Sequence, residues 1–159
     1  CSAHTFMLLA AELDELNGTP VPRATAGPEG DNPLVWRAYV IGEEDSPFDG
    51  GIFTLRLEFT TEWPKEDPNV RFLTSMFHPG VNPETGETNL AAMGMIQRDK
   101  KRKDRTVRTI LEAAVRFVSK SGYLSPSGCV FNEKAAVQIA KDLRGFEETA
   151  NRWTYAYAR

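Results

Sequence analysis

Residues 46–59 decide the fold of this chain, and they read Ser46-Pro47-Phe48-Asp49-Gly50-Gly51-Ile52-Phe53-Thr54-Leu55-Arg56-Leu57-Glu58-Phe59. The first six combine Pro, Asp and two Gly residues, which favour the backbone angles of a tight turn. From Gly51 to Phe59 apolar and polar residues alternate, so the apolar ones share one face of a strand. We therefore predict a hairpin turn that leads into a half-buried strand, whose buried set is Phe53, Leu55, Leu57 and Phe59.

Neighbouring strands are expected on both sides of this stretch. Residues 34–41 place Trp36, Ala38 and Val40 on alternate positions, and residues 70–74 form a shorter run. Residues 20–33 predict a short strand with loops, because proline at their density excludes a helix. Strands joined by tight turns indicate a four-stranded antiparallel meander.

Helices are expected at the two ends of the chain. Residues 6–18 carry Phe6, Leu9, Leu13 and Leu16 at steps of three and four, with Thr5 as the cap of this helix. Residues 77–105 contain scattered Pro and Gly and look irregular.

From Thr106 the apolar residues recur with helical spacing as far as Val118, and residues 122–128 break this helix. Asn132 caps the next helix, and Gly145 interrupts the chain before a last helix that contains Trp153. This order of elements predicts one α+β domain over residues 1–159.

The composition excludes several classes of protein. The chain has 159 residues, of which 41% are hydrophobic and 26% charged, so one ordinary core can stabilise it. Its two cysteines, Cys1 and Cys129, exclude a disulfide framework and a cysteine-based zinc site, and two histidines exclude a histidine-rich metal centre. We therefore expect neither a metal nor a cofactor. No apolar run is long enough for a membrane span. Since the numbering starts at Cys1, we expect a trimmed chain, in which any targeting leader is unobservable. We expect an intracellular location, in the cytoplasm or the nucleus.

The charge is distributed unevenly along the chain. Residues 1–70 hold 13 acidic and 4 basic residues, whereas residues 71–159 hold 9 acidic and 15 basic ones. Most of the basic excess lies between Arg98 and Arg108. Such a run can attract phosphate or nucleic acid, which makes a nucleic-acid-binding domain an alternative class of function. Because the run contains no Phe, Tyr or Trp to stack on bases, we expect a solvated segment and no nucleic-acid partner.

Several short motifs follow one another along nearly the whole chain. They are residues 26–28 with Trp36 and Ile41-Gly42, residues 46–53, Trp63-Pro64, residues 68–72, Phe77-His78-Pro79, residues 106–111, residues 132–136 and residues 150–158. In this order and spacing they resemble the ubiquitin-conjugating enzyme (UBC) family. The resemblance implies a UBC-like fold with an N-terminal helix, a four-stranded antiparallel meander, a long irregular segment around the active site and C-terminal helices, in agreement with the residue patterns.

The resemblance also indicates where the chemistry of the family takes place. A Cys that follows the His-Pro-Asn signature accepts ubiquitin as a thioester, because a thiolate is accessible and strongly nucleophilic near neutral pH. Here His78 and Pro79 open the signature, Gly80 replaces its Asn, and Asn89 falls at the Cys position in a segment one residue longer than usual. A carboxamide nitrogen delocalises its lone pair into the carbonyl group and forms no covalent intermediate. We therefore interpret His78, Pro79, Gly80 and Asn89 as a pseudo-active site without a catalytic residue.

Two other residues are alternatives for the missing nucleophile. Thr88, one position earlier, has no adjacent base to activate its hydroxyl. Cys129 stands in the loop before the helix that Asn132 caps, and the resemblance places this loop away from the thioester site.

The resemblance also implies that an oxyanion donor is missing. In the family the signature Asn stabilises an oxyanion, and Gly80 has no side chain to do so. Removal of one such donor typically loses roughly 2.7–4 kcal/mol of transition-state stabilisation.

The expected partner surfaces of the family are also altered. Working members carry a basic first helix that recruits the activating enzyme, whereas this helix has Glu12, Asp14 and Glu15. The loops that dock ubiquitin ligases are charged here, although an interface core needs apolar anchors. We expect these charged loops to form a different partner surface, consisting of Lys65, Glu66, Asp67, Lys100, Lys101, Arg102, Lys103 and Arg105.

The sequence thus favours a catalytically inactive member of the UBC fold that acts as an interaction module in the ubiquitin pathway or as an adaptor. Residues 81–87, Val-Asn-Pro-x-Thr-Gly-Glu, are similar to two groups in the family. One is the enzyme variants, which pair with an active conjugating enzyme, and the other is the Fused Toes (Akt-interacting) group of trafficking adaptors. The retained last two helices favour the second group. The partners expected are an active conjugating enzyme, ubiquitin or trafficking adaptors, and the alternative function is an active conjugating enzyme that uses Cys129.

Overall fold

The computed structural model describes residues 2–95, 105–124 and 130–159. Within them the chain forms one antiparallel sheet in which each strand pairs with the next along the sequence. Its strands are β1 (Ala24–Pro28), β2 (Val35–Ile41), β3 (Ile52–Glu58), β4 (Asn69–Phe72) and β5 (Glu87–Thr88). The predicted meander is therefore confirmed.

The strand β5 corrects the prediction of four strands, because it lies inside the segment that looked irregular. Gly86 has a φ of +78°, and its carbonyl oxygen accepts a hydrogen bond of 2.8 Å from the backbone nitrogen of Phe72. This turn brings Glu87 back beside Arg71 of β4. A strand of two residues has no alternating pattern that could reveal it in the sequence.

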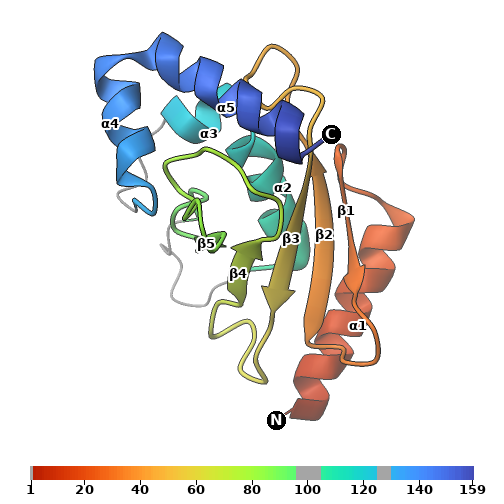
Figure 1. The fold of residues 1–159 in the computed structure, drawn as a ribbon. Coiled ribbons are helices and arrows are strands. Elements are labelled where there is room, and N and C mark those ends of the chain that lie inside the picture. Colours follow the sequence, from red (N-terminus) through yellow and green to blue (C-terminus); the bar gives the residue numbers. More distant parts are fainter. Residues whose placement is uncertain (1, 96–104, 125–129) are drawn as a thin grey trace.

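Helices cover one face of the sheet and one of its ends (Figure 1). They are α1 (Ser2–Gly18), α2 (Val107–Phe117), α3 (Lys120–Leu124), α4 (Glu133–Lys141) and α5 (Leu143–Tyr157). The C-terminus returns to the sheet, where the carbonyl oxygen of Ala158 accepts a hydrogen bond of 2.9 Å from the backbone nitrogen of Ile52. None of the helices in the part of the chain that is described is long and apolar enough to cross a membrane.

Three local predictions about the helices were wrong. Thr5 is no cap: the first helix already begins at Ser2, and the Thr5 hydroxyl donates to the carbonyl oxygen of Thr61 at 2.6 Å. The short helix α3 includes Gly122, where a break was expected. Gly145 lies inside α5, whose start is set by Asp142, because the Asp142 side chain accepts a hydrogen bond from the Gly145 nitrogen. The prediction that Asn132 caps a helix is confirmed, since its side chain accepts from the Ala135 nitrogen at 3.1 Å.

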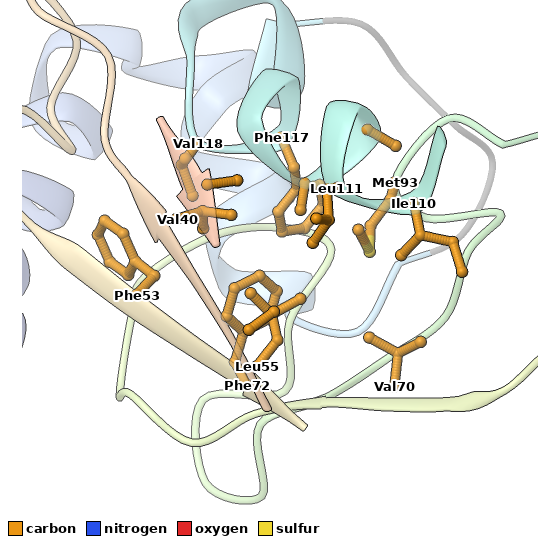
Figure 2. Packing of buried hydrophobic residues seen from close by; sticks show 14 of the residues in the cluster. Val40, Phe53, Leu55, Val70, Phe72, Met93, Ile110, Leu111, Phe117 and Val118 are labelled. Carbon is orange, nitrogen blue, oxygen red and sulfur yellow. The ribbon is translucent and has the colours of Figure 1, made fainter. Parts of the chain in front are cut away.

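The core lies between the sheet and α2. Inward-facing residues of β2, β3 and β4 point toward Ile110, Leu111 and Phe117 of α2 (Figure 2). The alternation predicted from the sequence is present, because Phe53, Leu55 and Leu57 are fully buried while Ile52 is 54% exposed. On α1, Leu9 and Leu16 are buried and Leu13 packs against the core, but Phe6 is 38% exposed. This packing fixes β4 and the start of α2, which carry the segment around the signature.

Candidate functional site

His78 is a fully enclosed structural residue. Its side chain has 1% exposure, Nε2 lies 2.9 Å from the carbonyl oxygen of Phe117, and Nδ1 accepts a hydrogen bond of 3.0 Å from the backbone nitrogen of Gly80. Since Nδ1 accepts, the proton of the neutral ring resides on Nε2 and is donated to Phe117. Burial lowers the pKa of His78 to about 3, so the imidazole is uncharged near neutral pH.

Two aromatic rings hold the imidazole between them. The ring of Phe117 stacks on His78 at a centroid distance of 3.8 Å and an interplanar angle of 19°, and Phe48 stacks at 5.6 Å and 26°. The sequence did not indicate these contacts, because Phe48, His78 and Phe117 are far apart along the chain. This enclosure leaves the imidazole no access to solvent or substrate.

Gly80 has no room for the side chain that the family signature places there. A Cβ atom at this position would come within 2.8 Å of Cε1 and 2.9 Å of Cζ of Phe117. The preceding carbonyl oxygen, of Pro79, accepts hydrogen bonds from the backbone nitrogens of Phe131 and Asn132 at 2.9 and 3.1 Å. The His78-Pro79-Gly80 turn therefore helps to position the start of α4.

The segment after the signature folds into a compact turn. The side-chain oxygen of Asn82 accepts hydrogen bonds from the backbone nitrogens of Glu84 and Thr85, at 2.8 and 3.1 Å. At Gly86 a Cβ atom would approach the carbonyl oxygen of Phe72 to 1.9 Å, so only glycine fits against β4. The Val-Asn-Pro-x-Thr-Gly-Glu run is thus explained by turn geometry.

Asn89, the residue predicted at the acceptor position, is exposed and caps a local turn. Its side-chain oxygen accepts a hydrogen bond of 2.8 Å from the backbone nitrogen of Ala92, and its carbonyl oxygen accepts one of 3.3 Å from Met93. These bonds satisfy the first backbone donors of the turn over residues 90–94. The neighbouring Thr88 is only 4% exposed, and its hydroxyl finds no hydrogen-bond partner among the residues that the structure describes. Among the described residues, Asn89 thus has a capping role and Thr88 is enclosed.

Both cysteines of the chain, Cys1 and Cys129, lie outside the described residues. Across residues 2–95, 105–124 and 130–159, no group of three or more His, Cys, Asp and Glu side chains could hold a metal ion.

In the loop of residues 65–67, which was expected to form part of a partner surface, one residue binds a buried arginine. Lys65 and Glu66 are exposed, whereas Asp67 binds Arg105 with a distance of 3.0 Å from Oδ1 to Nε. Arg105 also donates to the carbonyl oxygen of Met95 at 3.0 Å, and its side chain is 2% exposed. The prediction that Arg105 belongs to the partner surface is therefore wrong, because its guanidinium group is used inside the protein. Lys100, Lys101, Arg102 and Lys103 lie outside the described residues.

The acidic first helix and the end of the basic run contact each other. Glu12 accepts hydrogen bonds from the Trp63 indole nitrogen at 3.1 Å and from the Val107 backbone nitrogen, the first of α2, at 2.8 Å. Partial burial raises the pKa of Glu12 despite these two hydrogen bonds. Glu15 pairs with Arg108 at 2.9 Å. Part of the charge asymmetry in the sequence is thus neutralised between α1 and α2.

A family model described as ubiquitin-conjugating enzyme matches residues 8–154. The chain belongs to the ubiquitin-conjugating enzyme family. Among solved structures, the E2 domain of a Toxoplasma gondii ubiquitin conjugating enzyme matches with a TM-score of 0.77 and 23% sequence identity, covering 95% of this chain and 97% of that domain. At this identity the match shows a common fold. The family and the UBC fold inferred from the sequence motifs are therefore confirmed.

Proposed function

We propose that this member of the ubiquitin-conjugating enzyme family is catalytically inactive and acts as a protein-interaction module. The observation that carries the proposal is Asn89, whose side-chain oxygen caps the turn at Ala92 where active members have their acceptor thiol. A carboxamide at this place forms no thioester with ubiquitin.

The surroundings of Asn89 support the same conclusion. The oxyanion donor of the signature is missing at Gly80, and the Phe117 ring occupies the space that its side chain would need. His78 is neutral and enclosed, so it offers no acid or base to a substrate. The whole segment has the hydrogen bonds of a structural turn.

The altered surfaces favour partners other than the usual ones of conjugating enzymes. On α1, Glu12 accepts a hydrogen bond from Val107 and Glu15 pairs with Arg108. These acidic residues take the place of the basic ones that recruit the activating enzyme in working members of the family. Helices α4 and α5 are present, which favours a role like that of the trafficking adaptors over one like the enzyme variants. We place this function in the cytoplasm or the nucleus. Capture of coiled-coil or vesicle-tethering proteins in a pull-down supports the adaptor role, and capture of an active conjugating enzyme supports the other.

The proposal is tested by incubating the chain with activating enzyme, ATP and ubiquitin, followed by non-reducing electrophoresis. An active conjugating enzyme in a parallel reaction is the positive control. We expect no thiol-sensitive conjugate with the wild-type chain or with Cys129→Ala. A thiol-sensitive conjugate of the wild type that is lost in Cys129→Ala would overturn the proposal and establish the alternative enzyme.

A second measurement asks whether ubiquitin binds without a covalent bond. Labelled ubiquitin is titrated with the chain while its NMR chemical shifts are recorded. Saturable shifts in the absence of ATP and activating enzyme indicate an interaction module within the ubiquitin pathway. Unchanged shifts at high protein concentration indicate an adaptor whose partners lie elsewhere.

A further inference from the structure

Three hydroxyl residues of the chain are followed directly by proline, and the structure separates them. The dipeptides are Thr19-Pro20, Ser46-Pro47 and Ser125-Pro126. Ser46 is 7% exposed, and its hydroxyl donates to the carbonyl oxygen of Glu43 at 2.7 Å. Ser125 lies outside the described residues. Thr19 is exposed, and its hydroxyl makes no hydrogen bond within the part of the chain that the structure describes.

The chain around Thr19 leaves the helix and leads to the sheet. Helix α1 ends at Gly18, where an added Cβ atom would meet nothing within 4 Å, and Pro20 has no N–H to continue the helix. The next residue, Val21, is only 5% exposed and joins the core. Thr19 is therefore an accessible residue between the end of a helix and a buried anchor.

The backbone of Thr19 has two hydrogen-bond partners among the described residues. Its nitrogen donates to the carbonyl oxygen of Glu15 at 2.9 Å, and its carbonyl oxygen accepts from the guanidinium group of Arg108. The last turn of a helix opens at a low cost in free energy. Because the residue before a proline is biased toward extended backbone angles, Pro20 favours an extended form of Thr19 once this turn opens.

An accessible hydroxyl followed by proline in an extended segment is the substrate of proline-directed protein kinases. A proline at this position brings no N–H group into the kinase cleft, so no donor there is left unpaired. Ser46 has the same neighbour, but burial and its hydrogen bond to Glu43 keep its hydroxyl from a cleft. The tertiary structure thus favours Thr19 over Ser46.

A guanidinium group already lies at Thr19. Arg108 of α2 binds the Thr19 carbonyl oxygen and pairs with Glu15 through Nη2 at 2.9 Å and Nε at 3.0 Å. The Arg108 side chain is 25% exposed and the Glu15 side chain is 56% exposed. A phosphate on the Thr19 hydroxyl would carry a charge of about −1.5 to −2 and three acceptor oxygens beside this arginine.

We propose that Thr19 is a phosphorylation site of a proline-directed protein kinase and that its phosphate binds Arg108. The Thr19 oxygen Oγ1 forms a bond to the γ-phosphorus of ATP, while the bond between this phosphorus and the oxygen that bridges to the β-phosphate breaks. ADP leaves with that electron pair, and the hydroxyl proton passes to the carboxylate base of the kinase.

The phosphate changes the junction between α1 and α2. It places negative charge at the C-terminal end of α1, where the helix dipole disfavours it, and it repels Glu15. An exposed ion pair such as Glu15 with Arg108 contributes little to stability, whereas hydrogen bonds from a guanidinium to a phosphate are strong. Arg108 therefore moves its hydrogen bonds from Glu15 to the phosphate, and the Glu15 carboxylate becomes free on the surface of α1.

This site is separate from the pseudo-active site. Thr19 and Arg108 belong to the junction of α1 and α2, and neither contributes to the turn that Asn89 caps. Phosphorylation of Thr19 does not depend on whether the chain transfers ubiquitin, so the two proposals can fail independently.

The first test locates the modified residue on the whole chain. The chain is incubated with ATP and, in parallel reactions, with a purified cyclin-dependent kinase and a purified mitogen-activated kinase, and tandem mass spectrometry identifies the site. We expect phosphate on Thr19 and none on Ser46. A chain that stays unmodified at Thr19 with both kinases, or that is modified only at Ser46 or Ser125, overturns the proposal.

Variants test whether the proline directs the reaction. Pro20→Ala keeps the hydroxyl and should slow phosphorylation by at least about tenfold. Thr19→Ser keeps both the hydroxyl and the proline and is the matched control, with a rate within about threefold of wild type. Thr19→Val keeps the shape of the side chain and should not be modified at this position. Equal rates in Pro20→Ala and wild type contradict the assignment to a proline-directed kinase.

The contact with Arg108 is tested by phosphorus NMR of the phosphorylated chain during a pH titration. Because a guanidinium group favours the doubly charged phosphate, the midpoint should lie below that of a short phosphothreonine peptide, which is about pH 6. Arg108→Gln should move the midpoint back to the peptide value. Arg116→Gln, which changes an exposed arginine of the same helix, should leave it unchanged. A wild-type midpoint equal to that of the peptide, or one that Arg108→Gln does not change, overturns the assignment of the phosphate to Arg108.

Discussion

The side-chain oxygen of Asn89 lies 2.8 Å from the backbone nitrogen of Ala92 and accepts its hydrogen bond. At this position the family carries a thiol, which would be a far weaker hydrogen-bond acceptor. In the proposal of an inactive chain, the carboxamide that stands in place of the thiol also caps this turn. We therefore expect Asn89 to contribute to the local stability of the turn over residues 90–94.

Removal of this cap should destabilise the protein measurably. We expect Asn89→Ala to lower the free energy of unfolding by about 1 kcal/mol, because one backbone donor loses its partner. Asn89→Asp keeps an oxygen at the same place and should stay within about 0.5 kcal/mol of wild type. Urea denaturation followed by circular dichroism measures both changes. Equal stability of Asn89→Ala and wild type would show that the hydrogen bond does not contribute.

Restoring the signature asparagine should be unfavourable here. Gly80→Asn introduces a Cβ atom within 2.8 Å of the Phe117 ring, and we expect a loss of about 1–3 kcal/mol through overpacking. A smaller ring neighbour should relieve this clash, so Gly80→Asn combined with Phe117→Leu should lose less stability than the sum of the single changes. Thermal denaturation of all four proteins completes the cycle. Strict additivity would show that the two residues do not compete for space.

His78 makes stability dependent on pH in a defined window. Its pKa is lowered from 6.5 to about 3 in the folded state, so below pH 6.5 the unfolded chain binds a proton that the folded chain does not. Stability from this group is therefore complete above pH 6.5 and is lost as the pH falls toward 3, by up to about 1.4 kcal/mol per pH unit.

The measurement compares wild type with His78→Gln between pH 7 and pH 5. We expect His78→Gln to be less stable at pH 7, and its deficit relative to wild type to shrink as the pH falls. His4→Gln, on the exposed side of α1, is the matched control and should follow the wild-type profile. A deficit that stays constant over this range would contradict the assignment of a neutral, buried imidazole.

Two arginines of the same basic run should differ in their effect on stability. Arg105 is buried and binds Asp67 and the Met95 carbonyl, whereas Arg108 is 25% exposed and pairs with the 56% exposed Glu15. We expect Arg105→Ala to cost about 2–4 kcal/mol and Arg108→Ala less than about 1 kcal/mol. Chemical denaturation of the two variants provides the comparison. Similar losses would argue against an internal role for Arg105.

Glu12 links α1 to Trp63 and to the start of α2 through two hydrogen bonds, and its removal should destabilise the protein. Glu12→Ala removes the acceptor of two hydrogen bonds, one of them at the first turn of α2, and should lower the free energy of unfolding by about 2–3 kcal/mol. Asp14→Ala, an exposed acidic residue of the same helix, is the control and should change stability by less than about 0.5 kcal/mol. Tryptophan fluorescence during denaturation reports directly on the Trp63 environment. Equal effects of the two variants would contradict a stabilising role for the hydrogen bonds of Glu12.

The alternation of residues 51–59, the apolar spacing after Thr106 and the order of the family motifs were enough to predict the fold. These signals are local, because alternation and helical spacing depend on neighbours within a few residues. The predicted cap at Thr5 and the predicted break at Gly145 were wrong for the same reason. The end of a helix also depends on contacts with distant residues, and the Thr5 hydroxyl donates to Thr61, which is far along the sequence.

The sequence by itself determined that Gly80 follows His78-Pro79, and through the family resemblance it predicted that Asn89 falls at the acceptor position. Only the tertiary structure decided what those residues do instead: Asn89 caps a turn, Phe117 fills the place of the missing side chain, and Arg105 is buried rather than exposed. It also decided that Thr19 is exposed whereas Ser46 is enclosed. The sequence specifies which residues are present. Burial, charge pairing and unpaired backbone groups arise only when segments that are distant along the chain pack together, and this packing determines the free energies of the polar contacts.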